Sequence, residues 1–351
     1  MSGGVDSSVA AARLHAQGYE VIGVTLKLWH GEEGADARWQ DRTCCKVGIA
    51  RYVADRLGIP HHVFDVEEAF EREVIQDFCN EYLVGRTPNP CVRCNERVKF
   101  GHLIRVALEL GADHLATGHY ARVHYDGIRN RFTLLKGRDE AKDQSYFLYR
   151  LSQDQLARVL FPLGEIHKDE VWHEAEALGL PPDEIKESQE ICFVTKRDYR
   201  QFLEERYPEA MGQGEIVTEK GEVLSHHRGV AFYTVGQRKG LGIPASQRLY
   251  VTRLDPLQNR VVVGPEESLL QQELVAADLN YVSVSGFEGE RRVMAKIRYR
   301  HPEQSAWVTP LPEGRWRLTF ETPQRAIAPG QSVVLYEGEE VLAGGIIEEV
   351  V

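Results

Sequence analysis

Two cysteines stand three positions apart in the stretch "TPNPCVRCNERVKF". Cys91 and Cys94 form a C-x-x-C ahead of a predicted helix, and such thiols can bind a metal, form a disulfide or act as nucleophiles. A thiolate near a helix N-terminus, with Arg93 and Arg97 nearby, is expected to have a lowered pKa and to be reactive. Structural zinc is disfavoured because no second C-x-x-C exists. Thioredoxin-type redox chemistry is disfavoured because the expected βαβ context is absent.

A third candidate thiol, Cys192 in "SQEICFV", lies far away in the sequence. If the fold brings it to Cys94, the pair provides a donor thiol and a resolving thiol, which could join when their Cα atoms are about 4.4–6.8 Å apart. For Cys44, Cys45 and Cys79 we expect small buried hydrophobic residues instead.

The beginning of the chain, "MSGGVDSS", has the composition of a phosphate-binding loop. Adjacent glycines let backbone N–H groups turn inward, serines add hydroxyl donors, and an alanine-rich helix follows, so the free amides and the helix dipole favour an anion. The loop lacks the lysine of G-x-x-x-x-G-K-[ST], so it is not the usual P-loop. The alternative is a glycine-rich turn capped by Asp6 or Ser7.

The elements around these residues alternate between helix and strand. A short helix ends at Gly18, an apolar strand covers residues 21–28, a helix runs from about Lys46 to Gly58, and the strand "HHVFDV" follows. A third helix is closed by Gly111, and a strand leads to Gly118. This order predicts an α/β fold with a parallel sheet, in which the first loop and "ATGH" meet at the carboxyl ends of strands.

The second half of the chain is predicted to be mostly β. "GEIVTEKGEVLSHH" reads as a hairpin turning at Lys220 and Gly221, and the short runs from about Glu273 onward suggest a small β-barrel. Basic residues interleaved with Tyr299 and Trp316 could bind and stack on nucleic acid, or they could form a solvated barrel face. These basic residues are Arg291, Arg292, Lys296, Arg298, Arg300, Arg315 and Arg317.

Composition limits the function classes. The 351 residues suffice for two or three domains, and the formal net charge of −11 argues weakly against a nucleic-acid partner, although a local basic face can coexist with it. No apolar run approaches the ~20 residues of a membrane span and no signal peptide is visible, so we expect no membrane partner. Six unevenly spaced cysteines suit a reducing cytoplasm.

Eight motifs together give a specific resemblance that covers nearly the whole chain. They are "SGGVDSS", "TPNPCVRCNERVKFG", "ATGHYARV", "KDQSYFL", "SQEICFV", "YTVGQRKGLGI", "KIRYRH" and "APGQSVVLYEGEEVLAGGII". In number and order the set resembles the tRNA-specific 2-thiouridylases, members of the PP-loop ATP pyrophosphatase superfamily. The resemblance implies a PP-loop ATP-binding catalytic domain over residues 1–196, a central tRNA-contacting domain over 197–272 and a C-terminal β-barrel over 273–351.

The resemblance also implies a reaction in two halves. ATP, with Mg²⁺, adenylates the C2 oxygen of the wobble uridine in a tRNA anticodon, and sulfur then attacks C2. By position, Cys192 resembles the residue that holds a persulfide and Cys94 the nucleophile that helps release the sulfur, leaving a Cys94–Cys192 disulfide. A sulfur-relay or cysteine desulfurase protein is the implied persulfide donor.

The remaining site residues are carried over position by position. The implied ATP-binding residues are Met1, Ser2, Gly3, Gly4, Val5, Asp6, Ser7, Ser8, Leu26 and Gly118. Those facing the target base, which must leave the anticodon stack, are Asn89, Pro90 and Cys91. Those contacting tRNA are His119, Lys142, Asp143, Gln144, Arg298, Tyr299 and Gln331.

One residue departs from the family pattern, since many members carry an aspartate where this chain has Cys91. Together with Cys94 and Cys192 it would provide three thiolates, enough to hold a [4Fe–4S] cluster with one iron open to bind sulfide. The alternative is a tolerated substitution in the base-facing loop.

Two other functions are compatible with a nucleotide-binding fold. A PP-loop enzyme could instead act on a small-molecule acceptor, and an RNA-binding adaptor could keep an inactive nucleotide fold. The lack of a visible glutaminase domain and the paired cysteines disfavour the first, and the intact "SGGVDSS" with both cysteines disfavours the second. A PP-loop normally follows the central first strand of its sheet, so we expect the native chain to begin upstream of Met1.

Overall fold

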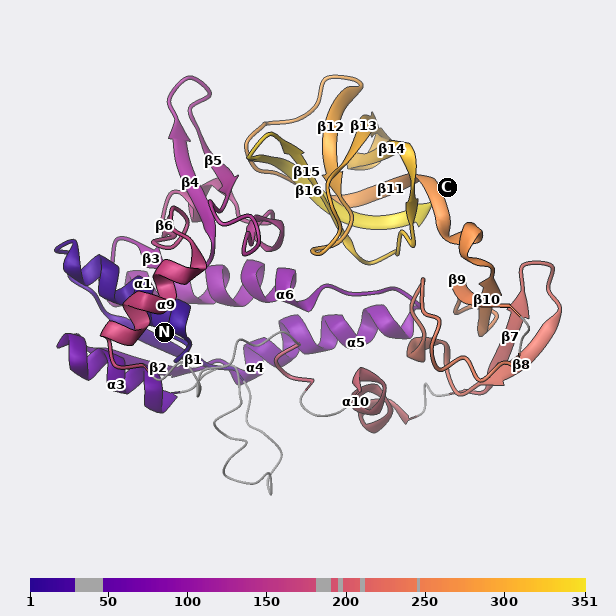
Figure 1. Cartoon of the computed structure of the whole chain (residues 1–351), viewed down its shortest axis with the longest axis horizontal. Coiled ribbons are helices and arrows are strands. Elements are labelled where there is room, and N and C mark those ends of the chain that lie inside the picture. Colours follow the sequence, from indigo (N-terminus) through magenta and orange to yellow (C-terminus); the bar gives the residue numbers. More distant parts are fainter. Residues whose placement is uncertain (29–46, 181–190, 195–197, 209–211, 245–246) are drawn as a thin grey trace. The chain divides into compact units, whose positions relative to one another are not determined.

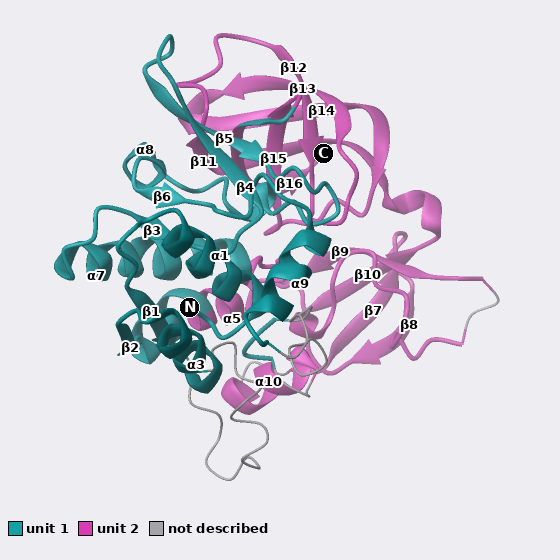
Figure 2. Cartoon of the chain, turned by 60° about the vertical axis from the view of Figure 1, so that its left-hand side comes forward, with its two compact units in different colours: residues 1–74, 91–195, 339–341 teal, residues 75–90, 196–338, 342–351 magenta. Residues whose placement is uncertain are grey.

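The structure is a computed structural model that describes residues 1–28, 47–180, 191–194, 198–208, 212–244 and 247–351 (Figure 1). It consists of two compact units (Figure 2). Unit 1 comprises residues 1–74, 91–195 and 339–341, and unit 2 comprises residues 75–90, 196–338 and 342–351. Among the described residues, no helix is long and apolar enough to cross a membrane.

Unit 1 is the predicted α/β part. Its strands form parallel pairs, β1 (Gly23–Lys27) with β2 (His61–Asp65) and β3 (Leu115–Ala116) with β6 (Val159–Leu160). A hairpin, β4 (Ala121–Asp126) and β5 (Arg131–Lys136), is antiparallel. The helices of this unit are α1 (Val5–Ala16), α3 (Val47–Leu57), α4 (Glu67–Phe70), α6 (Pro90–Arg93), α7 (Leu103–Glu109), α8 (Gln153–Leu156) and α9 (Lys168–Ala177). The expected alternation of helices with parallel strands is therefore confirmed.

The core of unit 1 is where α1 packs against α9 and α3. Val5 and Val9 of α1 are buried with Val171 and Ala175 of α9. Helix α1 forms because a glycine loop leads into an alanine-rich segment, and Gly18, whose φ is +87°, ends it as expected. The start of each helix is thereby held beside the other, and that region carries the phosphate loop.

Unit 2 contains a small mixed sheet and a closed barrel. The sheet has the strand order β8-β7-β10-β9. Its strands are β7 (Gly214–Thr218), β8 (Val223–His227), β9 (Tyr250–Asp255) and β10 (Arg260–Gly264). The predicted hairpin is confirmed, because β7 and β8 are antiparallel and Gly221 turns with φ +84°.

The barrel has six strands in the order β11-β14-β13-β12-β15-β16, and pairing of β11 with β16 closes it. The strands are β11 (Leu270–Tyr281), β12 (Arg291–Lys296), β13 (Gln304–Leu311), β14 (Arg315–Arg325), β15 (Ser332–Glu337) and β16 (Glu340–Val350). Its interior is filled by alternating apolar side chains such as Val293, Leu318 and Leu335. The expected barrel is thus confirmed, and it begins three residues before Glu273 because the first strand runs on from a short turn at residues 266–269.

Two further helices belong to unit 2. They are α5 (Gln76–Leu83), joined to α4 by a π-helical segment (Glu71–Ile75), and α10 (Tyr199–Arg206). Aromatic rings pack them together, with Tyr82 stacked on Tyr199 at 4.5 Å between ring centroids. Cys79 of α5 is fully buried, as expected of a structural cysteine. Cys44 and Cys45 lie outside the described residues.

Candidate active site

The loop before α1 leaves the helix without a side-chain cap. The N-cap residue is Gly4, which makes no side-chain capping hydrogen bond to the helix. The Ser7 hydroxyl donates to the Gly4 carbonyl at 3.1 Å and accepts from the Ser2 amide at 3.1 Å. Gly3 has φ +73°, a conformation that favours glycine. Asp6 and Ser7 do not cap the helix, although the Ser7 hydroxyl does close the turn before it. The first-turn amides of α1 are placed as in an anion site.

The segment after β3 lies directly against this loop. A Cβ added to Gly118 would lie 2.7 Å from the carbonyl carbon of Asp6 and 2.8 Å from the Ser7 amide nitrogen. The Tyr120 hydroxyl donates to Asp6 Oδ1 at 2.9 Å. The predicted meeting of "SGGVDSS" with "ATGH" is thus confirmed. Of the other two residues predicted to bind ATP, Leu26 is buried in β1, and Met1 donates its α-amino group to the Val24 carbonyl.

Sequence reasoning missed one charged residue at this place, Lys168. It is the first residue of α9, only 6% exposed, and its Nζ donates to Asp6 Oδ1 at 2.6 Å. A signal was available, because Lys168, Val171 and Ala175 recur at helical spacing on one face and the latter two are buried. A lysine on an apolar helix face needs a partner, and here the partner is the phosphate loop.

The C-x-x-C lies inside a helix and not ahead of one, so that prediction is corrected. Helix α6 begins at Pro90 and continues without a break into a π-helical segment (Cys94–His102). Proline suits the first helical position because it has no amide to leave unpaired. Cys91 is exposed and Cys94 is buried, and a spacing of three residues puts both on the same side of the helix.

The predicted lowering of the thiol pKa is wrong for Cys91. Although part of Cys91 is exposed, protein atoms crowd its thiol, and this desolvation raises the pKa. Lys99 opposes the shift, whereas Cys192 adds to it, so Cys91 and Cys192 interact electrostatically. The charge of Arg93 is instead engaged by Glu96 at 3.2 Å. Cys91 is accordingly a neutral thiol at neutral pH.

The three candidate thiols are the possible ligands of an iron–sulfur cluster. Cys91, Cys94 and Cys192 all belong to unit 1 and are all thiols, not disulfides. Nevertheless, the described part of the chain contains no group of three or more His, Cys, Asp or Glu side chains arranged to hold a metal ion. As placed, these thiols do not form a ready iron–sulfur site.

Of the residues predicted to contact tRNA in unit 1, His119 is a neutral ring and Asp143 is a carboxylate held by hydrogen bonds. Desolvation, reinforced by the charge of Lys99, lowers the pKa of His119 well below its ordinary value, so the ring is neutral at physiological pH. Asp143 is buried, and its carboxylate accepts hydrogen bonds from the amides of Gly137 and Ser145 and from the Ser145 hydroxyl.

Gln144 accepts a hydrogen bond from the Tyr120 amide at 3.1 Å. Asp143 and Gln144 together therefore fix the chain beside His119 and Tyr120. Lys142, the residue before them, is half-buried. A buried carboxylate with these amide and hydroxyl donors is suited to holding a turn, not to meeting a polyanion.

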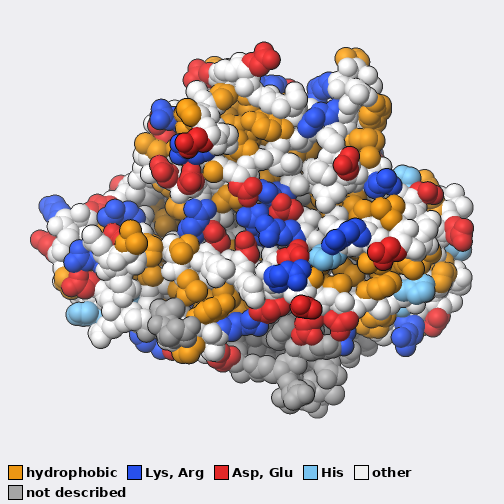
Figure 3. Space-filling view, turned by 180° about the vertical axis from the view of Figure 1, so that it is seen from behind, with side chains coloured by type: hydrophobic (Ala, Val, Ile, Leu, Met, Phe, Trp, Pro, Cys, Tyr) orange, Lys and Arg blue, Asp and Glu red, His pale blue; other side chains and the backbone are white. Residues whose placement is uncertain are grey.

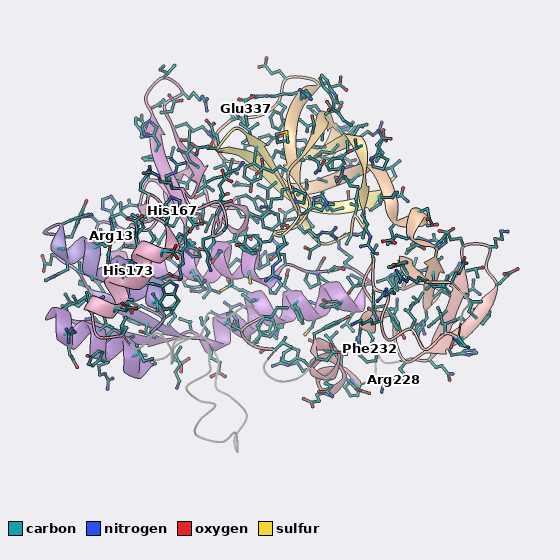
Figure 4. All side chains as sticks on the ribbon, in the orientation of Figure 1. Arg13, His167, His173, Arg228, Phe232 and Glu337 are labelled. Atoms are coloured by element: carbon teal, nitrogen blue, oxygen red, sulfur yellow. The ribbon has the colours of Figure 1, made fainter. Side chains whose placement is uncertain are left out.

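In the barrel, the predicted stacking role of Trp316 is wrong. Its side chain is fully buried in the barrel core and donates from Nε1 to the Tyr281 hydroxyl at 3.1 Å. Several basic residues are paired with acids, for example Arg291 with Glu337 at 2.8 Å (Glu337 is labelled in Figure 4). On the face drawn in Figure 3, basic and acidic side chains are interspersed.

Two neighbouring residues of the barrel, Arg298 and Tyr299, remain candidates for contact with tRNA. Arg298 donates to the Arg325 carbonyl at 2.9 Å, which fixes its side chain. Tyr299 is half-buried, and the ammonium of Lys296 lies 5.6 Å from the centroid of its ring.

Gln331 holds the segment that leads into the C-x-x-C helix. Its side-chain amide donates to the carbonyls of Thr87 at 3.0 Å and Pro88 at 2.9 Å. The Thr87 amide donates to the Pro329 carbonyl at 2.8 Å. Gly330 has φ +90°, and a Cβ there would lie 2.8 Å from the Thr87 nitrogen. Within unit 2, the chain just before Asn89 is thus attached to the barrel.

The arrangement of loop, strands and thiols is that of a nucleotide-binding α/β domain with several free cysteines. Models of three families match in sequence: "tRNA methyl transferase HUP domain" over residues 1–196, "tRNA methyl transferase PRC-barrel domain" over 200–265 and "Aminomethyltransferase beta-barrel domain" over 271–347. The chain belongs to the tRNA-specific 2-thiouridylase family.

Relatives support this assignment along the full length. The chain is 51% identical over 353 residues to the tRNA-specific 2-thiouridylase MnmA of Moorella thermoacetica, covering 100% of this chain and 98% of that protein. It is 48% identical to the Pelotomaculum thermopropionicum enzyme, covering 99% and 96%. The U34-tRNA thiolase NcsA from Methanococcus maripaludis with its [4Fe-4S] cluster is 22% identical, covers 60% of this chain and 65% of that one, and has a TM-score of 0.32, too low to support an argument.

The close approach at Gly118 generates a prediction. We expect Gly118→Ala to force the Asp6–Ser7 peptide away and to cost about 1–3 kcal/mol of stability or, if the loop moves instead, to weaken ATP binding at least about tenfold. Calorimetry and thermal unfolding measure both. Gly127→Ala is the control, because a Cβ there meets nothing within 4 Å. Unchanged ATP affinity and stability in Gly118→Ala would contradict the geometry.

The attachment by Gln331 generates a second prediction. Gln331→Glu cannot donate to Thr87 and Pro88 and places a carboxylate against their carbonyls, so we expect a loss of about 1–3 kcal/mol and faster hydrogen exchange of the Thr87 amide. Gln272→Leu is the matched control, because Gln272 donates to the Phe320 carbonyl inside the barrel, away from this segment. Equal exchange at Thr87 in Gln331→Glu and the wild-type protein would rule out the attachment.

Proposed function

We propose that this chain catalyses ATP-dependent 2-thiolation of the wobble uridine of tRNA anticodons. Family membership supports the overall reaction. The observation that carries the chemistry is that one compact unit contains both an uncapped helix N-terminus in a glycine–serine loop and the free thiols of Cys94 and Cys192. Activation by a nucleotide and transfer of sulfur require these two kinds of site.

The first half of the reaction is activation of the uridine. The amides of residues 2–8, with the adjoining Gly118, are proposed to hold the phosphates of ATP, and Mg²⁺ bound to ATP neutralises part of their charge. The C2 oxygen of uridine then attacks the α-phosphorus and pyrophosphate leaves. The product is an adenylated base whose C2 oxygen departs with AMP in the next step.

The second half is sulfur transfer. A persulfide on Cys192 attacks C2, and AMP leaves with the oxygen. Cys94, as thiolate, then attacks the Sγ of Cys192, the bond between that Sγ and the transferred sulfur breaks, and the electron pair forms the thiocarbonyl. A Cys94–Cys192 disulfide remains, which an external thiol must reduce. Because Cys91 is a neutral thiol, it does not compete as nucleophile in this scheme.

The RNA-facing parts follow from the same proposal. Asn89, Pro90 and Cys91 lie where the chain enters α6, and we propose that the flipped base meets them. His119, Lys142, Arg298, Tyr299 and Gln331 are proposed to contact the tRNA, while Asp143 and Gln144 position the segment between them. The persulfide is proposed to come from a sulfur-relay or cysteine desulfurase protein in the cytoplasm.

The reaction is tested with purified protein, ATP, a persulfide source and tRNA, followed by nucleoside analysis for 2-thiouridine. We expect Cys94→Ser and Cys192→Ser to abolish 2-thiouridine while retaining RNA-dependent release of pyrophosphate, because only the sulfur half needs them. Cys79→Ala is the control thiol, buried in α5. Normal thiolation by Cys94→Ser would overturn the assignment, and AMP formation with a small acceptor but no RNA would favour a small-molecule PP-loop enzyme.

Anaerobic reconstitution with iron and sulfide separates the persulfide route from the iron–sulfur alternative. The persulfide route predicts full activity without bound iron, and full activity in Cys91→Ala. About four iron atoms per chain, together with loss of both iron and activity in Cys91→Ala, would replace it with a cluster held by Cys91, Cys94 and Cys192.

A further inference from the structure

We propose that Lys168 is the cation of the phosphate site and that its ammonium binds the phosphates of ATP that leave as pyrophosphate. This inference rests on the proposed use of ATP at residues 2–8. The loop itself carries no lysine. A lysine instead reaches it from α9, with Nζ 2.6 Å from Asp6 Oδ1.

The burial of Lys168 is the first argument. At 6% exposure, its ammonium has lost nearly all of its hydration, which is costly for a charged group. Buried ion pairs contribute little net stability compared with apolar residues of similar size. An ammonium has three N–H donors, so it can bridge a carboxylate oxygen and a phosphate oxygen. The pair lies beside the uncapped first turn of α1, so the ammonium is placed where an anion held by those amides would be.

The second argument is that Lys168 is held rigidly. Its Nζ lies 4.9 Å from the Trp172 ring centroid and 5.7 Å from that of Tyr120, distances at which aromatic rings stabilise a cation. Its backbone amide donates to Asp139 Oδ2 at 2.9 Å, which anchors the start of α9. His167, the preceding residue, is labelled beside this helix in Figure 4. A preorganised cation stabilises developing negative charge without reorganisation during the reaction.

The competing explanation is that Lys168 only neutralises Asp6 and joins α9 to α1. The chain offers a matched comparison, because Arg13 of α1 pairs with Glu174 of α9 at 2.6 Å (Arg13 is labelled in Figure 4). This second pair joins the same two helices about two turns farther along and does not touch the loop. A purely structural lysine and a phosphate-binding lysine therefore predict different results when the two pairs are broken separately.

The test measures the binding of three probes, ATP, inorganic pyrophosphate and AMP, to the wild-type protein and to Lys168→Met and Arg13→Met. We expect Lys168→Met to weaken ATP and pyrophosphate binding about 10- to 100-fold and to leave AMP within about twofold, because a lost charge-assisted contact affects only the leaving phosphates. Arg13→Met is expected to lower the thermal unfolding midpoint and to leave all three affinities unchanged. Equal losses for ATP and AMP in Lys168→Met, or no loss at all, would overturn the proposal.

A second variant covers the case in which Lys168→Met does not fold. Lys168→Arg keeps the charge beside Asp6 and is expected to bind pyrophosphate within about tenfold of the wild-type protein. A folded Lys168→Arg that loses pyrophosphate and AMP binding to the same extent would overturn the proposal, because a contact to the leaving phosphates cannot affect AMP. Assaying 2-thiouridine with the wild-type protein in parallel keeps the two hypotheses apart: absence of thiolation with intact ATP binding contradicts the proposed function and leaves the role of Lys168 to the binding data.

Discussion

The ion pair between Asp6 and Lys168 is the interaction on which the arrangement of the glycine–serine loop in unit 1 depends. It joins the first turn of α1 to the first residue of α9, and the Tyr120 hydroxyl donates to the same carboxylate oxygen. Three segments distant in sequence therefore converge on one atom. The absence of a side-chain cap on α1 becomes intelligible in this light, because its first-turn amides face a region organised for an anion, not for a local cap.

Charge compensation also explains the environment of the cysteines. Three arginines lie close to Glu96, and Arg150 Nε is 2.8 Å from its carboxylate, so the arginines next to the C-x-x-C in sequence do not serve the thiols. Lys99 provides the positive charge instead, and it acts on Cys91 and on His119 alike. The result is a neutral Cys91 and a neutral His119 that share the influence of one lysine.

The barrel of unit 2 holds the segment at Thr87 and Pro88 through backbone geometry more than through surface charge. Its arginines are largely matched by glutamates, for instance Arg292 with Glu321 at 2.8 Å. Gly330 and Gln331, by contrast, hold Thr87 and Pro88 through contacts that need a glycine at positive φ and an amide donor. The segment before the C-x-x-C is thereby kept in one conformation by residues more than two hundred positions away.

The sequence by itself determined the alternation of helices and parallel strands, the hairpin at Gly221, the barrel and the meeting of Gly118 with the phosphate loop, because periodicity and turn residues act locally. Only the tertiary structure decided that Lys168 reaches Asp6, that Trp316 points into the barrel and that Glu96 withholds Arg93 from Cys91. The physical reason is that pKa values, burial and ion pairing depend on which distant side chains displace water around a group. A pattern of residues three or seven positions apart does not contain that information.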